Sequence, residues 1–531
     1  MKRFLFIALA TLGFVACAER GEENPTIQTG ELEQSYMAVS LLADDMTTRA
    51  AGDFYEDGEA DERVVKSLYF FLFDAEGNAF NIDGGVNYKA VNVNESGNTP
   101  TGAAPDGTPN VSDVKDKVLV FKNYVGEYPA KIVAVINWVP AIGATSYTLN
   151  ALAEQLIELK NGDGAFVMSN AVYAAESTNA TANKEAIRAT ALTPANIAKK
   201  EADALANPVK IYVERIAAKV SVATTAENKY DIGEEVDGTK VYAKVLGWEL
   251  YNEFDKSYLL KKIDASWTDS AVGFSWNDSA WFRSYWATSP VANFGAENQV
   301  SYNTLSNAID ASDYCGENTY NADCTKVVVK AELVKENGEA IEIATWFGND
   351  YINEEALRTV VANTLASQLY YLNGAEYKSI EAGDLKVVEA NETNPNTEAQ
   401  LKAYHVFFQL SVAGEAKDWY TYSTAEGFKA ADDNSVNVIL GGVEPALLYK
   451  GGQTYYYTDI KHLPSTVDAT QYGVVRNHVY KVNINSISGF GTPVYDGDTM
   501  FDPETPADIK TFISAEVRIL SWRVVEHGYD L

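Results

Sequence analysis

The chain is poor in the residues that build most metal and redox sites. It contains four histidines, three cysteines and five methionines in 531 residues. The four histidines are not spaced from one another or from cysteine as zinc ligands are. A Gly-x-Ser-x-Gly nucleophile elbow and a phosphate-binding loop are also missing. We therefore expect no metal site, no cofactor and no enzymatic activity.

Basic residues are scarce as well. The chain has 42 Lys and Arg against 74 Asp and Glu, which gives a formal net charge of −32. Nucleic acids and anionic membranes are bound through clustered basic side chains, so this balance excludes them as main ligands. A strongly acidic surface instead suits a soluble, self-repelling extracellular protein.

Long apolar runs are missing except at the N-terminus, where the pattern is that of an export signal. Lys2 and Arg3 precede a short apolar run over residues 4–15, and Ala16 and Cys17 follow it. The run is too short to span a bilayer permanently, and the layout matches a secretory signal peptide over residues 1–16. Residues 12–17 have the order of a lipobox, so we expect lipidation of Cys17 in the outer membrane, with an ordinary cleaved signal as the alternative.

The composition favours strands over helices. Thirty-two Tyr, 21 Phe and nine Trp accompany many Val, Ile and Thr. We expect a mainly β protein with a few short helices, one of them over residues 151–160 and one capped by Asn353. The expected strands include residues 64–73, 117–121, 131–138, 404–412, 436–440, 455–458 and 477–487. We place an N-terminal domain at residues 50–210 and a C-terminal domain at residues 211–488.

Residues 17–49 form a candidate propeptide. An acidic linker leads into residues 36–41, whose alternation puts Met37, Val39 and Leu41 on one face of a strand. Arg49 follows in a segment of polar and small residues, where a trypsin-like protease reaches a chain easily. We expect proteolytic processing between Arg49 and Ala50.

The C-terminus carries a second isolated strand pattern. Residues 489–508 are rich in Gly, Pro and Asp and read as a linker. An alternating segment follows, and its apolar set changes phase near its end, which is typical of a bulge or of contact with two surfaces. The apolar residues of this segment are Ile513, Ala515, Val517, Ile519, Leu520 and Trp522.

Two further cysteines, Cys315 and Cys324, lie in a loop rich in Gly, Asn and Asp. Outside the reducing cytoplasm they can form a disulfide that staples this loop, or they can remain free thiols.

Several of these motifs together resemble the fimbrillin superfamily of Bacteroidales. They are residues 475–487 (VRNHVYKVNINSI), residues 515–522 (AEVRILSW) and Val213-Glu214-Arg215 followed by Lys219-Val220. Within the superfamily the chain most resembles the minor-fimbria (Mfa-like) shaft fimbrillins of type V pili. The resemblance implies two β-sandwich domains of transthyretin-like topology, lipoprotein export and cleavage at Arg49 by an Arg-specific protease.

The resemblance also implies a mechanism of assembly. Removal of residues 18–49, with their strand, would open a groove in which the C-terminal strand of a neighbouring copy, residues 511–524, takes its place. Because donor and groove are different surfaces, such contacts run head to tail and build a filament. The implied partners are other copies of the chain, accessory tip and anchor subunits, and receptors on host or bacterial surfaces. The resulting fimbria would support adhesion and biofilm formation. The alternative is a lipid-anchored surface protein that binds a glycan or acts as an adhesin without polymerising.

Overall fold

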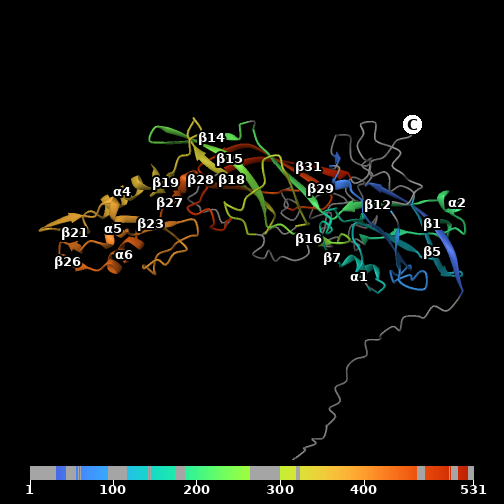
Figure 1. Ribbon diagram of the computed structural model, residues 1–531. Coiled ribbons are helices and arrows are strands. Elements are labelled where there is room, and N and C mark those ends of the chain that lie inside the picture. The colour runs from blue at the N-terminus through green and yellow to red at the C-terminus, as the bar shows by residue number, and fades with distance from the viewer. Residues whose placement is uncertain are drawn as a thin grey trace, which may run out of the picture.

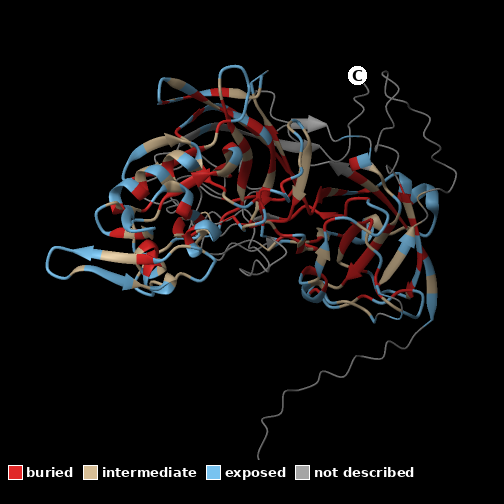
Figure 2. Cartoon of the chain, turned by 60° about the vertical axis from the view of Figure 1, so that its left-hand side comes forward, coloured by how far each residue is buried: buried red, intermediate tan, exposed pale blue. Residues whose placement is uncertain are grey.

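The computed structural model shows an elongated molecule built mainly of β-sheets with a few short helices (Figure 1). It describes residues 31–43, 55–57, 59, 61–91, 93, 117–141, 143, 145–174, 186–225, 227–262, 299–318, 323–462, 473–501, 503 and 512–523. The mainly β class expected from the aromatic and β-branched composition is confirmed. Figure 2 shows the buried residues gathered inside the sheets and the exposed ones on the outer hairpins and helices.

An eight-stranded sheet holds the N-terminal core. Its order is β4-β3-β6-β8-β12-β1-β5, with β11 paired to β6. β3 and β6 are buried along nearly their whole length, whereas β5 alternates buried and outward residues, as a strand with one solvated face does. The strands are β1 (Leu32–Ala43), β3 (Leu68–Phe73), β4 (Tyr88–Val91), β5 (Lys117–Tyr124), β6 (Lys131–Ile136), β8 (Met168–Asn170), β11 (Thr190–Ala191) and β12 (Val209–Arg215).

Short elements surround this sheet. They are η2 (Asp61–Arg63), α1 (Leu149–Ala153), β7 (Leu156–Glu158), β9 (Tyr173–Ala174), β10 (Ala186–Ile187), η4 (Pro194–Asn196), α2 (Glu201–Leu205) and β16 (Lys256–Tyr258). The helix expected over residues 151–160 is wrong beyond Ala153. The chain there turns into β7 because β7 pairs with β16, so a distant strand overrides local helix preference.

Two five-stranded sheets form a sandwich in the C-terminal half. One has the order β17-β13-β29-β31-β2 and the other β14-β15-β18-β28-β30. Val220 and Val482 of the first sheet share a core with Val245 and Val329 of the second. The strands are β2 (Tyr55–Asp57), β13 (Ala218–Ala223), β14 (Lys229–Val236), β15 (Thr239–Tyr251), β17 (Ser312–Cys315), β18 (Lys326–Val334), β28 (Gln453–Asp459), β29 (His478–Ser488), β30 (Thr492–Pro493) and β31 (Phe512–Arg523).

Residues 343–448 add a lobe with a hydrophobic core of its own, at the left end of the molecule in Figure 1. Leu357 and Leu365 of α4 pack there with Phe408 of β24 and Leu440 of α6. The elements of this lobe and its border are β19 (Ile343–Trp346), β20 (Asn349–Ile352), α4 (Asn353–Leu365), β21 (Leu369–Asn373), β22 (Glu376–Ser379), η6 (Ala382–Asp384), β23 (Leu385–Glu389), β24 (Val406–Leu410), α5 (Val412–Glu415), β25 (Trp419–Ser423), β26 (Gly427–Ala431), α6 (Asp433–Gly441), β27 (Leu447–Tyr449) and η7 (Lys450–Gly452).

Two predictions for this lobe had opposite outcomes. The helix beginning at Asn353 is confirmed as α4, and the Asn353 side chain accepts a hydrogen bond from the Ala356 N–H at 3.1 Å. The strand expected over residues 436–440 is wrong, because these residues lie in α6. Asp432 caps this helix by accepting a hydrogen bond from the Ser435 N–H at 2.8 Å.

Candidate subunit-assembly site

The strand of the candidate propeptide is an interior strand of the N-terminal sheet. β1 extends over Leu32–Ala43, longer than the predicted 36–41. Its first part pairs antiparallel with β5, from Leu32 opposite Tyr124 to Val39 opposite Lys117. Its last part pairs parallel with β12, from Val39 opposite Val209 to Ala43 opposite Val213. β1 therefore joins two strands that no other described strand of the sheet joins (Figure 1).

The side chains of β1 belong to the N-terminal core. Met37 and Val39 are 0% exposed and Leu41 is 1% exposed. They share one cluster with Phe121 of β5 and Ile211 of β12. The three residues predicted to face one side of the strand are thus placed together in the core. Complete burial of three such side chains stabilises the sheet by roughly 5–9 kcal/mol, as an upper estimate.

Polar contacts hold the N-terminal part of β1. Ser35 is buried, and its hydroxyl donates to Asn123 Oδ1 at 2.6 Å. Tyr36 and Ala198 exchange two backbone hydrogen bonds of 2.9 Å each. Withdrawal of β1 would leave unpaired backbone groups on β5 and β12 and an apolar floor between them, which is the form of a strand-accepting groove.

The C-terminal strand is paired within its own chain. β31 lies antiparallel to β29 over ten positions, from Phe512 opposite Ser488 to Ser521 opposite His478. On its other edge, residues 521–523 pair in parallel with β2. The segment therefore contacts two strands, and the register irregularity falls opposite Ala515, between Ile484 and Ser486 of β29. The side chains of the predicted donor residues lie outside the described part of the structure.

The predicted lipidation and cleavage residues also lie outside the described residues. These are Cys17, Arg49 and Ala50. Their neighbours on either side are placed: β1 ends at Ala43 in the N-terminal sheet, and β2 begins at Tyr55 beside β31 in the C-terminal sandwich. Arg49 therefore stands in the sequence between a strand of one sheet and a strand of another.

A buried carboxylate anchors the chain shortly after β2. Glu62 is 0% exposed and accepts from the Tyr314 hydroxyl at 2.5 Å, while Lys219 Nζ lies 2.9 Å from Glu62 Oε1. The Arg215 guanidinium donates from Nε and an η nitrogen to the Glu62 carbonyl at 3.1 and 3.0 Å. Burial raises the pKa of Glu62, but the hydrogen bonds from Tyr314 and Lys219 outweigh it, and the net pKa is lowered.

A second group of buried charges joins β12 and the segment just ahead of β29 to residues 256–262. Arg476 is fully buried and donates to Glu317 Oε2 at 2.7 Å and to the Tyr258 carbonyl at 2.6 Å. Lys261 donates to Glu214 at 2.9 Å, and burial raises the pKa of Glu214 to about 7 despite this pair. The Val-Glu-Arg and Val-Arg-Asn-His motifs that carried the family resemblance thus supply structural ion pairs.

The two loop cysteines are buried free thiols in this structure. Cys315 lies in β17 opposite Ala218, and Cys324 lies beside Lys326. Burial raises the pKa of Cys324 to about 11 and also raises the pKa of Cys315 well above its usual range. Within the described ranges, no group of three or more His, Cys, Asp or Glu is arranged to hold a metal, and no helix is long and apolar enough to cross a membrane.

Sequence reasoning missed two parts of this arrangement. It gave no role to Glu62, one of 74 acidic residues, since its partners Tyr314 and Lys219 are remote in the chain. It also did not identify β5 and β12 as the walls beside β1. Alternating apolar residues mark both walls as strands, but nothing local specifies which strands become neighbours.

Comparison with protein families matches residues 447–528 to the C-terminal region of fimbrillin, described as a major fimbrial subunit protein. This segment runs from β27 through β31 and contains two of the motifs on which the resemblance rests. The fimbrillin resemblance is confirmed there. No curated protein sequence matches the chain.

The chain is similar to several solved structures, among them the following three. A proposed cell adhesion protein from Parabacteroides distasonis is 14% identical with a TM-score of 0.36, and the match covers 93% of this chain and 98% of that one. The C-terminally truncated tip fimbrial protein Mfa3 from Porphyromonas gingivalis is 13% identical with a TM-score of 0.27, covering 92% and 100%. A fimbrial assembly protein from P. distasonis is 11% identical with a TM-score of 0.27, covering 76% and 100%.

Proposed function

We propose that the chain is a shaft subunit of a bacterial surface fimbria. It is exported as a lipoprotein anchored through Cys17, cleaved after Arg49 and polymerised by donor-strand exchange, in which β31 of one copy replaces β1 of the next. The observation that carries this proposal is the position of β1. A strand just ahead of Arg49, the predicted cleavage site, fills the sheet between β5 and β12, so one cut there would separate it covalently from the domain it completes.

The two strands suit an exchange. β1 and β31 are each twelve residues long. In leaving its own chain, β31 loses ten paired positions with β29 and three with β2. In the groove that β1 occupies, it can form eight paired positions with β5 and five with β12. Because the backbone pairing can be conserved, side-chain burial in the groove decides whether the exchange is favourable.

The uncut chain would be protected against early assembly. As long as β1 remains covalently attached, its return to the groove is intramolecular and competes effectively with a donor strand from another molecule. Cleavage turns β1 into a separate peptide that can diffuse away. Since groove and donor strand are different surfaces, the resulting contacts run head to tail and extend without closing.

The test is to treat the purified precursor with an Arg-specific protease and to analyse unboiled samples on a denaturing gel. We expect a ladder of multimers, with Ala50 as the new N-terminus by mass spectrometry. Arg49→Ala should remain uncut at this site, and a chain lacking residues 511–531 should be cut yet remain monomeric. A wild-type chain that is cut after Arg49 and stays monomeric would contradict donor-strand exchange and favour the tethered, non-polymerising binding protein.

The lipid anchor is tested separately. Cells producing the chain are labelled with radioactive palmitate, and their outer membranes are isolated. The wild type should carry label and partition with the membrane, whereas Cys17→Ala should carry none. Equal labelling of both would place the lipid elsewhere.

A further inference from the structure

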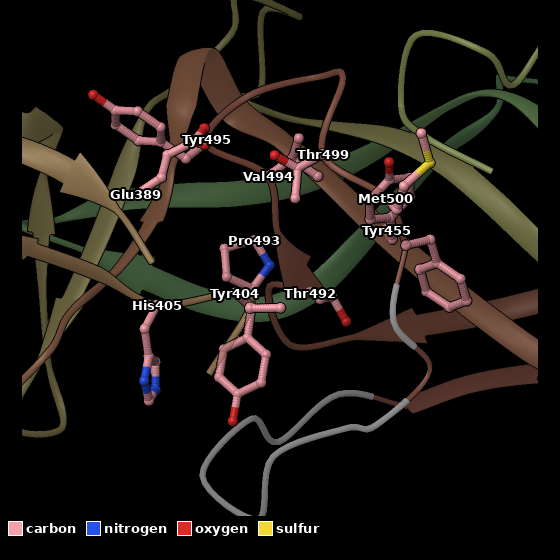
Figure 3. A pocket seen from close by; sticks show the side chains of 12 residues that line it. Glu389, Tyr404, His405, Tyr455, Thr492, Pro493, Val494, Tyr495, Thr499 and Met500 are labelled. Carbon is pink, nitrogen blue, oxygen red and sulfur yellow. The ribbon is translucent and has the colours of Figure 1, made fainter. Parts of the chain in front are cut away.

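A pocket opens between the residue 343–448 lobe and the segment that follows β30 (Figure 3). One side is formed by Glu389 at the end of β23 and by Tyr404 and His405 ahead of β24. The other side includes Tyr455 of β28 and residues 492–495 and 499–501. It holds about 500 Å³ of space, part of it open to solvent. Because this space includes open solvent, a ligand bound here would remain partly exposed.

Two buried polar atoms of the lining have no hydrogen-bond partner among the described residues. One is the hydroxyl of Tyr455, a residue only 4% exposed, and the other is Oε1 of Glu389. Burial and the nearby Tyr302 raise the pKa of Tyr455 well above its usual range, so the hydroxyl keeps its proton and can donate it. Unmade hydrogen bonds of buried groups are costly, so a ligand that completes them gains affinity.

Aromatic and apolar side chains form the rest of the walls. The rings of Tyr455 and Phe501 lie 5.4 Å apart, and the rings of Tyr404 and His405 lie 4.7 Å apart, edge to face. Pro493 and Met500 add apolar surface. The Tyr495 hydroxyl already donates to the Val387 carbonyl at 3.2 Å. We therefore consider Tyr455 and Glu389 as the groups that would bind a ligand.

We propose that this pocket binds a neutral pyranose, the terminal sugar of a glycan. A sugar presents C–H faces that pack on aromatic rings, and its hydroxyl groups both donate and accept. One hydroxyl donates to Glu389 Oε1 while another accepts from the Tyr455 hydroxyl. This would give the subunit a ligand-binding role in addition to assembly.

Charged ligands fit less well. Burial raises the pKa of Glu389, and the nearby carboxylates of Asp496 and Glu392 raise it further, so the surroundings of the pocket repel anions. A sialylated or sulfated glycan is therefore excluded. An alkylammonium ion would pair with Glu389, but it has no acceptor for the Tyr455 hydroxyl.

Saturation-transfer NMR on the uncleaved full chain tests the proposal. The probes are methyl α-D-mannopyranoside, methyl β-D-galactopyranoside, methyl α-L-fucopyranoside and N-acetyl-D-glucosamine, with n-butylammonium as the cationic competitor. We expect saturation of at least one sugar, about a tenfold loss of affinity in Tyr455→Phe, which removes one hydrogen bond, and a smaller loss in Glu389→Gln, whose neutral amide oxygen accepts a weaker hydrogen bond than the carboxylate does. Both changes keep the shape of the side chain.

Matched controls separate the pocket from the rest of the surface. Glu376→Gln removes an exposed carboxylate of β22 and Tyr422→Phe removes an exposed hydroxyl of β25; neither residue lines the pocket, and both variants should bind sugar normally. The proposal is overturned if no sugar is saturated, if the double variant of Tyr455 and Glu389 binds unchanged, or if only n-butylammonium binds. None of these outcomes affects the polymerisation test, because the sample here is uncleaved.

Discussion

Leu41→Ala should loosen β1 from its sheet. Leu41 is 1% exposed and lies in the N-terminal core, opposite Ile211 of β12. Truncation of a fully buried leucine to alanine removes transfer free energy and leaves a cavity, which together cost about 2–5 kcal/mol. The matched control is Leu32→Ala at the other end of the same strand, where the side chain is 38% exposed and the expected loss is below about 1 kcal/mol.

Two measurements quantify the loss of stability caused by Leu41→Ala. Urea unfolding of the uncleaved chain, monitored by hydrogen exchange of β5 and β12, gives the change in the free energy of unfolding of the N-terminal sheet. In a chain cleaved after Arg49, the dissociation rate of the β1 peptide should rise about 30-fold or more for Leu41→Ala, since each 1.4 kcal/mol is a factor of ten. After cleavage, multimers of Leu41→Ala should therefore appear sooner than multimers of the wild type.

The comparison of Leu41→Ala with Leu32→Ala tests whether β1 belongs to the core and whether it is displaced during assembly. If Leu41→Ala and Leu32→Ala lower stability equally little, β1 is not part of the core and the groove argument fails. If Leu41→Ala destabilises the uncut chain but does not accelerate peptide release, the strand is structural and is not displaced during assembly.

Three further predictions concern buried groups. Arg476→Ala should cost about 3–5 kcal/mol in thermal or urea unfolding because it leaves a buried carboxylate unpaired, whereas Lys66→Ala, at an exposed pair of 3.8 Å, should cost less than about 1 kcal/mol. Burial, aided by neighbouring carboxylates, raises the pKa of Glu253 to about 8, so stability falls as the pH rises from about 4.5 to 8, and Glu253→Gln should add roughly 1–3 kcal/mol at pH 8 and flatten this slope. Peptide mass spectrometry after alkylation should find Cys315 and Cys324 unmodified in the native chain and both modified after unfolding without reductant; modification of neither after unfolding would reveal a disulfide.

Local patterns predicted individual elements well. The alternation over residues 36–41 indicates a strand, and β1 contains it. Asn353 marks the start of α4 because a short polar side chain can satisfy the free N–H groups of a first turn. The apolar run at residues 436–440 was misread because strands and buried helices share such runs, and the deciding signal, the Asp432 cap, precedes it.

Pairing between distant segments could not be predicted. The parallel pairing of β1 with β12 joins Val39 to Val209, and nothing in either segment specifies the other. The separate core of residues 343–448 was likewise invisible, because alternation reveals that a residue is buried and not which cluster it joins. The pocket lined by Glu389 and Tyr455 depends on the same kind of contact, since only the fold places these two residues at one pocket.

Glu62 offers a test of how the chain is anchored next to the processing site. Its pKa is lowered, so the stabilisation that it gives is present above the ordinary glutamate value of 4.5 and is lost as the pH falls through its lower folded value. Glu62→Gln leaves Lys219, 5% exposed, without its charge partner and should cost about 3–5 kcal/mol near pH 7. As the pH falls from 4.5 through this lower folded value, the variant and the wild type should converge in urea unfolding. Glu339→Gln, at an exposed pair with Lys335, should change stability little at any pH. A Glu62→Gln penalty that persists unchanged at low pH would show that packing, and not the ion pair, holds this segment against the C-terminal sandwich.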